Sequence, residues 1–155
     1  MLFKEIVGLE KTKKQLITSL NKRRVAHSQL FSGPKGSGKL AAVVAYAQFL
    51  NCTLTANEDS CGNCSSCLKF SKLSHPDFHI IFPTIKKSST DMPFSEDFLS
   101  EWKEQFLQNP YFSLKDWMFN YKEKFLEKSS DKKKEPVIYS HQIKELNRRL
   151  SLKIY

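Results

Sequence analysis

The chain has 155 residues, of which 40% are hydrophobic and 12% aromatic, so it can bury a core as one domain or as part of a larger one. Its formal net charge of +9 favours an anionic partner such as a nucleotide or nucleic acid without identifying one, because the basic residues are spread along the chain. No apolar run reaches the length of a membrane span and the first residues lack a signal-peptide pattern, so we expect a cytoplasmic protein with no membrane partner.

The first half of the chain predicts a strand, a glycine loop and a helix in succession. An amphipathic helix is expected first, over Glu10–Asn21. The short apolar segment His27–Phe31 then runs into the glycine loop, and Leu40–Asn51 follows with many Ala and Val residues and no Gly or Pro. A buried strand, a glycine loop and a buried helix in this order are what a phosphate-binding loop requires.

The loop matches the phosphate-binding pattern G-x-x-x-x-G-K-[ST] at every fixed position except the last. Its residues are Gly33, Pro34, Lys35, Gly36, Ser37, Gly38, Lys39 and Leu40. Backbone N–H groups of such a loop cradle phosphates, and Lys39 can reach the β- and γ-phosphates. Leu40 stands where a hydroxyl normally helps to hold Mg²⁺. We therefore predict a nucleotide-binding site for ATP or ADP with impaired hydrolysis and a Mg²⁺ site that lacks one usual ligand.

Four cysteines form a module at residues 52–67 with the spacing C-x8-C-x2-C-x2-C. They are Cys52, Cys61, Cys64 and Cys67. Four thiolates make a closed tetrahedral Zn²⁺ shell with no position for water, so the pattern predicts a structural zinc ion. An iron–sulfur cluster prefers other spacings, and a redox C-x-x-C pair would not need four cysteines. His75 and His79 lie close by, but four sulfurs already complete the shell.

The rest of the chain predicts one more strand and several helices. We expect a short helix at Ser65–Ser74, a buried strand at Phe78–Phe82 that stops at Pro83, and a polar loop at Lys86–Phe94. The later segments are a helical hairpin of Ser95–Gln108 and Ser113–Glu127, a charged linker at Ser129–Glu135, a brief extended segment at Val137–Tyr139 and a last helix at Ser140–Leu150. The aromatic stripes of the hairpin favour packing on the body of the protein, with a partner-binding surface as the alternative.

These elements together predict an α/β fold of the P-loop NTPase class, with a parallel sheet flanked by helices. Only two convincing strands are present, which is few for such a sheet. No apolar run that ends in a pair of acidic residues follows the last helix, although a P-loop ATPase needs such an acid to organise Mg²⁺ and water. We therefore expect the sequence to be the N-terminal portion of a truncated P-loop domain.

A phosphate loop and helix followed directly by this cysteine spacing resembles the clamp-loader ATPases of bacterial DNA polymerase III, an AAA+ family. Three further segments resemble the family, namely Phe3–Gly8, His27–Gly33 and His75–Asp77, and so do Ile143–Leu146 with Leu150–Lys153. The resemblance covers Phe3 to about Phe82 and His141–Tyr155, so residues 1–155 are expected to be a partial AAA+ domain. Residues 84–136 depart from the pattern and are interpreted as a helical insertion.

The resemblance implies a function and a set of partners. The family's opening segment lies against the adenine, which makes Ile6 and Val7 candidate nucleotide contacts. Gamma/tau subunits hydrolyse ATP and carry Thr after the loop lysine, whereas delta-prime subunits often have a degenerate site, so Leu40 favours the delta-prime type. Such a subunit joins gamma/tau and delta subunits in an assembly that loads the sliding clamp on primed DNA. DNA polymerase activity would belong to the holoenzyme, since the chain has no carboxylate pair placed for two-metal chemistry.

Two alternatives remain open from the sequence. The chain could be an ATP-hydrolysing gamma/tau subunit, with Mg²⁺ held mainly by an acid outside this sequence. It could also be a zinc-dependent nucleic-acid-binding module that uses its basic surface and the aromatic residues Trp102, Tyr111 and Trp117.

Overall fold

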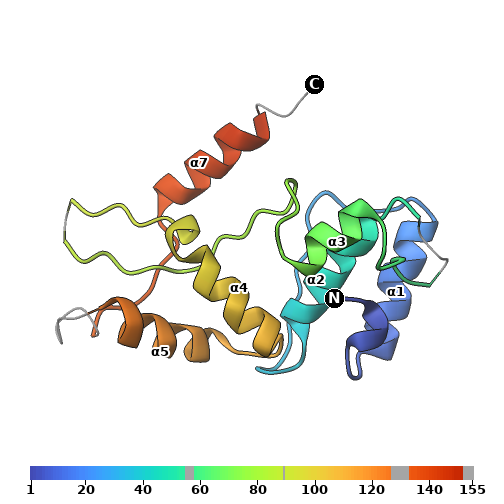
Figure 1. Cartoon of the computed structure of the whole chain (residues 1–155), viewed down its shortest axis with the longest axis horizontal. Coiled ribbons are helices and arrows are strands. Elements are labelled where there is room, and N and C mark those ends of the chain that lie inside the picture. The colour runs from blue at the N-terminus through green and yellow to red at the C-terminus, as the bar shows by residue number, and fades with distance from the viewer. Residues whose placement is uncertain (55–57, 89, 127–132, 152–155) are drawn as a thin grey trace. The chain divides into compact units, whose positions relative to one another are not determined.

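The computed structural model of the chain divides into two compact units (Figure 1). It describes residues 1–54, 58–88, 90–126 and 133–151. The first unit comprises Met1–Phe78 together with Phe106–Tyr111, and the second comprises His79–Gln105 together with Phe112–Tyr155. None of the helices within the described ranges has the length and apolar character that a membrane crossing requires.

The first unit is built around helix α2 (Lys39–Leu50). The short 3-10 helix η1 (Phe3–Glu5), helix α1 (Glu10–Asn21) and helix α3 (Ser65–Ser71) each contact α2. The sequence of α2 is apolar on almost every side, which is typical of a helix that is buried all round. The core residues of η1 and α2 are Phe3, Ile6, Ala41, Ala42, Ala45, Tyr46 and Phe49, and leucines of α1 pack against them.

The second unit has an aromatic core. It contains the 3-10 helix η2 (Ser95–Phe98), most of helix α4 (Leu99–Gln108), helix α5 (Leu114–Phe125) and helix α7 (Ser140–Ser151). Phe82 stacks on Trp102 with ring centroids 6.0 Å apart and meets the edge of Trp117 at 5.1 Å. All three side chains are almost fully buried, so burial of large rings contributes strongly to the stability of this unit.

The predicted parallel sheet is wrong for the described part of the chain. Neither His27–Phe31 nor Phe78–Phe82 forms a strand, and the pairing of strand type among the described residues is an isolated antiparallel bridge between Thr84 and Val137. The boundary between the two units also falls inside the second predicted strand, so His79–Phe82 belong to a different unit from His27–Phe31.

The backbone groups near Phe82 are satisfied in another way. The hydroxyl of Ser95 accepts a hydrogen bond from the N–H of Phe82 at 3.0 Å and lies 2.9 Å from the carbonyl oxygen of Phe82. Two residues later, the N–H and carbonyl of Thr84 pair with those of Val137 at 3.1 Å each. Buried backbone groups need partners, and a buried serine and a single bridge supply them here. In the other predicted strand, His27–Phe31, the side chain of Leu30 is 92% exposed, which a buried strand would not allow.

The helices agree much better with the sequence predictions. Helix α1 has the predicted bounds, and α2 and α7 differ from them by one residue. Helix α3 ends three residues earlier than predicted, and the predicted helix at Ser95–Gln108 begins with the 3-10 turn η2. Residues 127–132 and 152–155 lie outside the described residues. Most of the predicted linker, the end of the predicted helix Ser113–Glu127 and part of the resemblance at Leu150–Lys153 fall on these residues. The insertion at 84–136 stays a prediction.

The aromatic residues that the nucleic-acid alternative requires are mostly buried. Trp102 is 4% exposed and Trp117 is 2% exposed, so neither ring can stack on a base without unfolding the second unit. These side chains form core instead, as the first interpretation of the hairpin stripes predicted.

Candidate metal centre and phosphate loop

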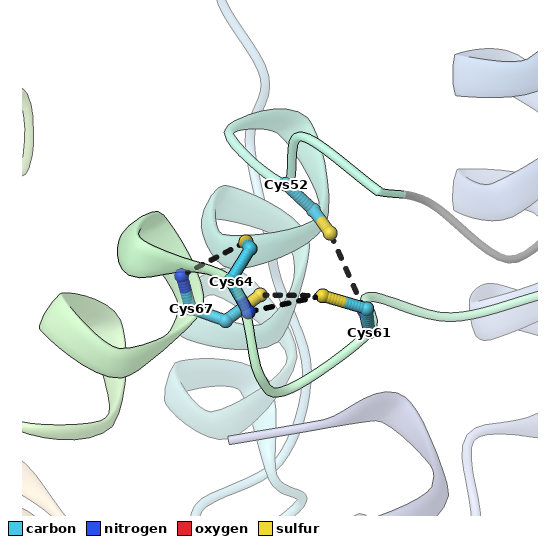
Figure 2. A group of neighbouring side chains, drawn as sticks. All are labelled: Cys52, Cys61, Cys64 and Cys67. Carbon is cyan, nitrogen blue, oxygen red and sulfur yellow. Dashed lines mark hydrogen bonds between the residues drawn. The ribbon is translucent and has the colours of Figure 1, made fainter.

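The four cysteines meet at the C-terminal end of α2. Cys52 lies two residues after α2 ends, Cys61 lies in the loop that follows, Cys64 caps the N-terminus of α3 and Cys67 lies in its first turn. All four sulfur atoms lie within 4.8 Å of one another (Figure 2). Gly62 adopts a positive φ of 76° between Cys61 and Cys64, a conformation that glycine allows at little cost. The folded chain therefore brings together all four predicted metal ligands.

Backbone N–H groups point at these sulfur atoms. The N–H of Cys61 donates to the Sγ of Cys52 at 3.3 Å, that of Cys64 to Cys61 at 3.3 Å, and that of Cys67 to Cys64 at 3.4 Å. Donors of this kind stabilise thiolates, which are the metal-binding form of cysteine. The Sγ atoms of Cys61 and Cys67 are 3.9 Å apart, close to the ~3.8 Å that tetrahedral geometry and a Zn–S bond of about 2.3 Å require.

The four thiols differ in pKa. Hydrogen bonds from the Thr53 hydroxyl and from the N–H of Cys67 lower the pKa of Cys64 to about 5, and backbone hydrogen bonds lower the pKa of Cys61. Burial raises the pKa of Cys67 to about 12 and also raises that of Cys52. A metal ion that binds all four must therefore displace protons from the two more buried thiols, so its affinity rises with pH.

The donor set fits a structural zinc ion. Four sulfurs complete a tetrahedral shell, so the site offers no open position for a substrate. His75 has other partners, since its ring stacks on Phe70 at 4.5 Å and its Nδ1 lies 3.2 Å from the N–H of Asp77. Within the described ranges, the group of neighbouring side chains able to hold a metal consists of the four cysteines alone.

The cysteine loop also holds the N-terminal segment, which the sequence did not indicate. Asp59 accepts hydrogen bonds from the N–H groups of Phe3 and Lys4, each at 3.1 Å. The side chain of Leu2 lies against Gly62, with its methyl carbons 3.7 and 3.8 Å from the place that a Cβ on this glycine would take. Residues 2–4 therefore rest on the loop that connects Cys52 to Cys64.

The phosphate loop lies at the opposite end of α2. Gly33–Gly38 precede the helix, Gly38 is its N-cap with a φ of 78°, and Lys39 is its first residue. A helix of this length spans about 18 Å, which separates the loop from the cysteine cluster. The N-terminus of a helix favours anions, because its first N–H groups are unpaired and its dipole is positive there. Leu40 is the second residue of the helix and offers no oxygen to a cation.

The lysine of the loop is held by the loop itself. The Nζ of Lys39 donates to the carbonyl of Gly33 at 2.9 Å and to that of Pro34, and it lies 3.3 Å from the Oγ of Ser37. A phosphate that binds Lys39 must therefore replace these internal partners.

Two residues that the sequence did not assign to the site contact its predicted N-terminal part. The buried Nζ of Lys13 donates to the carbonyl of Ile6 at 2.7 Å and pairs with Glu10 at 2.9 Å. The hydroxyl of Tyr111 accepts a hydrogen bond from the N–H of Val7 at 2.8 Å. Ile6 is buried and Val7 is 82% exposed, and both of these hydrogen bonds are made by backbone groups of the two residues. The sequence indicated Tyr111 only as an aromatic residue of the nucleic-acid alternative, and it gave no signal of this contact, which joins residues 104 positions apart.

Proteins that resemble this chain include bacterial DNA polymerase III subunits and a plant protein. The delta-prime subunit of DNA polymerase III from Bacillus subtilis (strain 168) is 37% identical over 78 residues, which make up 48% of this chain and 23% of that protein. The tau subunit from the same strain is 35% identical over 65 residues, or 42% of this chain and 12% of that protein. The protein STICHEL from Arabidopsis thaliana is 32% identical over 78 residues, or 50% of this chain and 6% of that protein.

The chain thus spans less than a quarter of each of these relatives. No solved structure matches it. Residues 8–155, which are nearly the whole chain, match the family described as "DNA polymerase III, delta subunit". The cysteine cluster and the glycine loop at the two ends of α2 therefore occur in a chain that belongs to the DNA polymerase III delta-subunit family.

Proposed function

We propose that the chain is a delta-prime-like subunit of the DNA polymerase III clamp loader, which supports ATP-dependent loading of the sliding clamp on primed DNA. The family match and the delta-prime and tau relatives support a role in this machinery. One observation carries the choice of subunit: the loop is complete through Lys39, but the next residue of α2 is Leu40, which cannot ligate Mg²⁺. Its partners would be gamma/tau and delta subunits, and it would act in the cytoplasm.

The proposed ligands follow from the two ends of α2. Cys52, Cys61, Cys64 and Cys67 hold a structural zinc ion, which ties α2 to α3. At the other end, the N–H groups of Gly33–Gly38 and the ammonium of Lys39 bind the phosphates of ATP or ADP. The backbone of Ile6 and Val7 contacts the base. The chain itself hydrolyses ATP weakly or not at all, because the position after Lys39 supplies no metal ligand.

Reconstitution tests this function. The chain is mixed with the gamma/tau and delta subunits of its own organism, and complex formation is followed by size-exclusion chromatography with light scattering. Loading of a fluorescent sliding clamp on primed DNA is then measured with and without the chain. We expect a stable complex and clamp loading that requires the chain. The absence of both would overturn the proposal.

An ATP-hydrolysing gamma/tau subunit is the second candidate. It is favoured by the tau relative, which is nearly as similar in sequence as the delta-prime relative. The two candidates differ in what Lys39→Ala does to ATP turnover in the assembly, because a gamma/tau subunit hydrolyses ATP at its own loop.

A further inference from the structure

The side chain of Tyr111 joins two parts of the proposed nucleotide site. Its hydroxyl accepts a hydrogen bond from the N–H of Val7, as described above. Its ring lies against Gly38, with the ring carbon Cε1 only 2.9 Å from the place that a Cβ on residue 38 would occupy. Only a residue without a side chain allows so close an approach. Tyr111 thus contacts both the N-terminal segment and the N-cap of α2.

The chain around Tyr111 holds it in this place. The residue follows the Asn109–Pro110 turn after α4, and its N–H donates to the side-chain oxygen of Asn109 at 3.0 Å. Residues 106–111 also belong to the first unit, although the helices before and after them lie mostly in the second. The turn of the helical hairpin therefore supplies a side chain to the loop's own unit.

Both groups that Tyr111 covers are groups that a ligand could use. The N–H of Val7 is a backbone donor in a residue that is otherwise exposed. Gly38 is the N-cap of α2, where an anion would meet unpaired N–H groups. At the same time, the ammonium of Lys39 is turned to the carbonyls of its own loop. The loop therefore has its lysine, its helix cap and its neighbouring donor all engaged within the protein.

We propose that Tyr111 is the gate of the phosphate loop: the loop is closed while the ring covers Gly38, and a nucleotide binds when Tyr111 leaves. This inference rests on the proposed nucleotide site. The apparent affinity for nucleotide is then the intrinsic affinity reduced by the fraction of molecules in which the gate is open. A residue far from the glycine loop in sequence thereby controls the access of nucleotide to this loop.

The gate is tested by nucleotide binding to the zinc-loaded full chain. Wild type, Tyr111→Phe and Tyr111→Ala are titrated with a fluorescent ADP analogue, and hydrogen exchange is measured at the Val7 amide. Phe119→Ala is the matched control, because Phe119 is an aromatic residue of α5 that is 68% exposed. We expect Tyr111→Ala to bind ADP more tightly than wild type. The gain should reach the factor of about three to ten by which the loss of one hydrogen bond changes an equilibrium constant.

The other two variants separate the ring from the hydroxyl. Tyr111→Phe should speed hydrogen exchange at the Val7 amide and raise the affinity for ADP by less than Tyr111→Ala does. Phe119→Ala should behave as wild type in both measurements. Equal, measurable binding by wild type and Tyr111→Ala would overturn the gate and leave the nucleotide site standing. Weaker binding by Tyr111→Ala would identify Tyr111 as a ligand contact and would also overturn the gate. No binding by any folded variant would overturn the nucleotide site and the gate together.

Discussion

At the scale of single residues, Leu40 separates nucleotide binding from hydrolysis in the proposed function. The chain has the glycine loop and the Lys39 that would hold phosphates, whereas the hydroxyl that normally holds Mg²⁺ is missing. The loop is thus expected to bind nucleotide without much help from the metal.

Leu40→Thr should therefore make nucleotide binding depend on Mg²⁺. We expect affinity for ATP in the presence of Mg²⁺ to rise by about tenfold, which corresponds to ~1.4 kcal/mol. Leu40→Val is the matched control, since Val has the shape of Thr without the hydroxyl. Isothermal titration with and without Mg²⁺ measures the effect, and an equal change in both variants would show that the hydroxyl is not what the site lacks.

A second residue-scale feature is the charge cluster on α7. The carboxylate of Glu145 accepts hydrogen bonds from Arg148 at 2.7 and 2.9 Å and from Arg149 at 2.8 Å. These bonds lower the pKa of Glu145 from 4.5 to about 2. Because the folded-state pKa is the lower one, this contribution to stability is fully present above about pH 4.5 and is lost as the pH falls toward 2.

Removing one arginine should raise this pKa. In a titration followed by NMR, Glu145 of the wild type should titrate near pH 2, and Arg148→Gln should move its pKa upward toward 4.5. Lys144→Gln removes a neighbouring positive charge that makes no such hydrogen bond and should shift it less. High salt should also raise the pKa, since exposed charges are screened. A wild-type pKa near 4.5 would show that the cluster does not persist in solution.

At the scale of elements, local patterns predicted the helices and failed for the sheet. The bounds of α1 and α2 follow from apolar spacing and from the glycine before Lys39, which are local signals. A strand exists only if another segment pairs with it. The apolar run that ends at Phe82 gives no sign that the side chain of Ser95 forms hydrogen bonds with the backbone N–H and carbonyl of Phe82. Spacing alone also predicted the four-cysteine cluster, because the ligands lie within 16 consecutive residues.

The contacts of Asp59 were equally invisible in the sequence, since they join residues 55 or more positions apart. They tie residues 3 and 4 to the cysteine loop. Asp59→Ala should therefore destabilise the chain by about 1–3 kcal/mol and speed hydrogen exchange at the Phe3 and Lys4 amides. Urea unfolding and exchange measure the two effects. Glu58→Ala, a neighbouring exposed residue, should change neither, and equal effects of both variants would contradict the role of Asp59.

Removal of the metal should act on one end of α2 only. We expect elemental analysis to find about one zinc ion per chain. A chelator should then expose residues 58–67 to exchange and proteolysis, with residues 2–4 following because they rest on that loop, while α2 stays helical. Acidification should release the ion as the thiolates take up protons. A chain that contains no metal and does not respond to the chelator would refute the zinc centre.

At the scale of the whole molecule, family membership and the residue after Lys39 together bear on the type of subunit. The chain belongs to the DNA polymerase III delta-subunit family, and its relatives include subunits of both the delta-prime and the tau type. If Leu40 marks the chain as the delta-prime type, the assembly hydrolyses ATP at other subunits. The lysine of this loop is then dispensable for turnover, although it contributes to nucleotide binding.

The most direct measurement is the ATP turnover of the reconstituted assembly on primed DNA with one loop lysine replaced at a time. Lys39→Ala in this chain should leave the rate within about twofold of wild type, because the loop hydrolyses little ATP. The corresponding Lys→Ala change in the gamma/tau subunits should abolish turnover. Loss of ATP turnover through Lys39→Ala, in an assembly that still forms and still binds the clamp, would contradict the account.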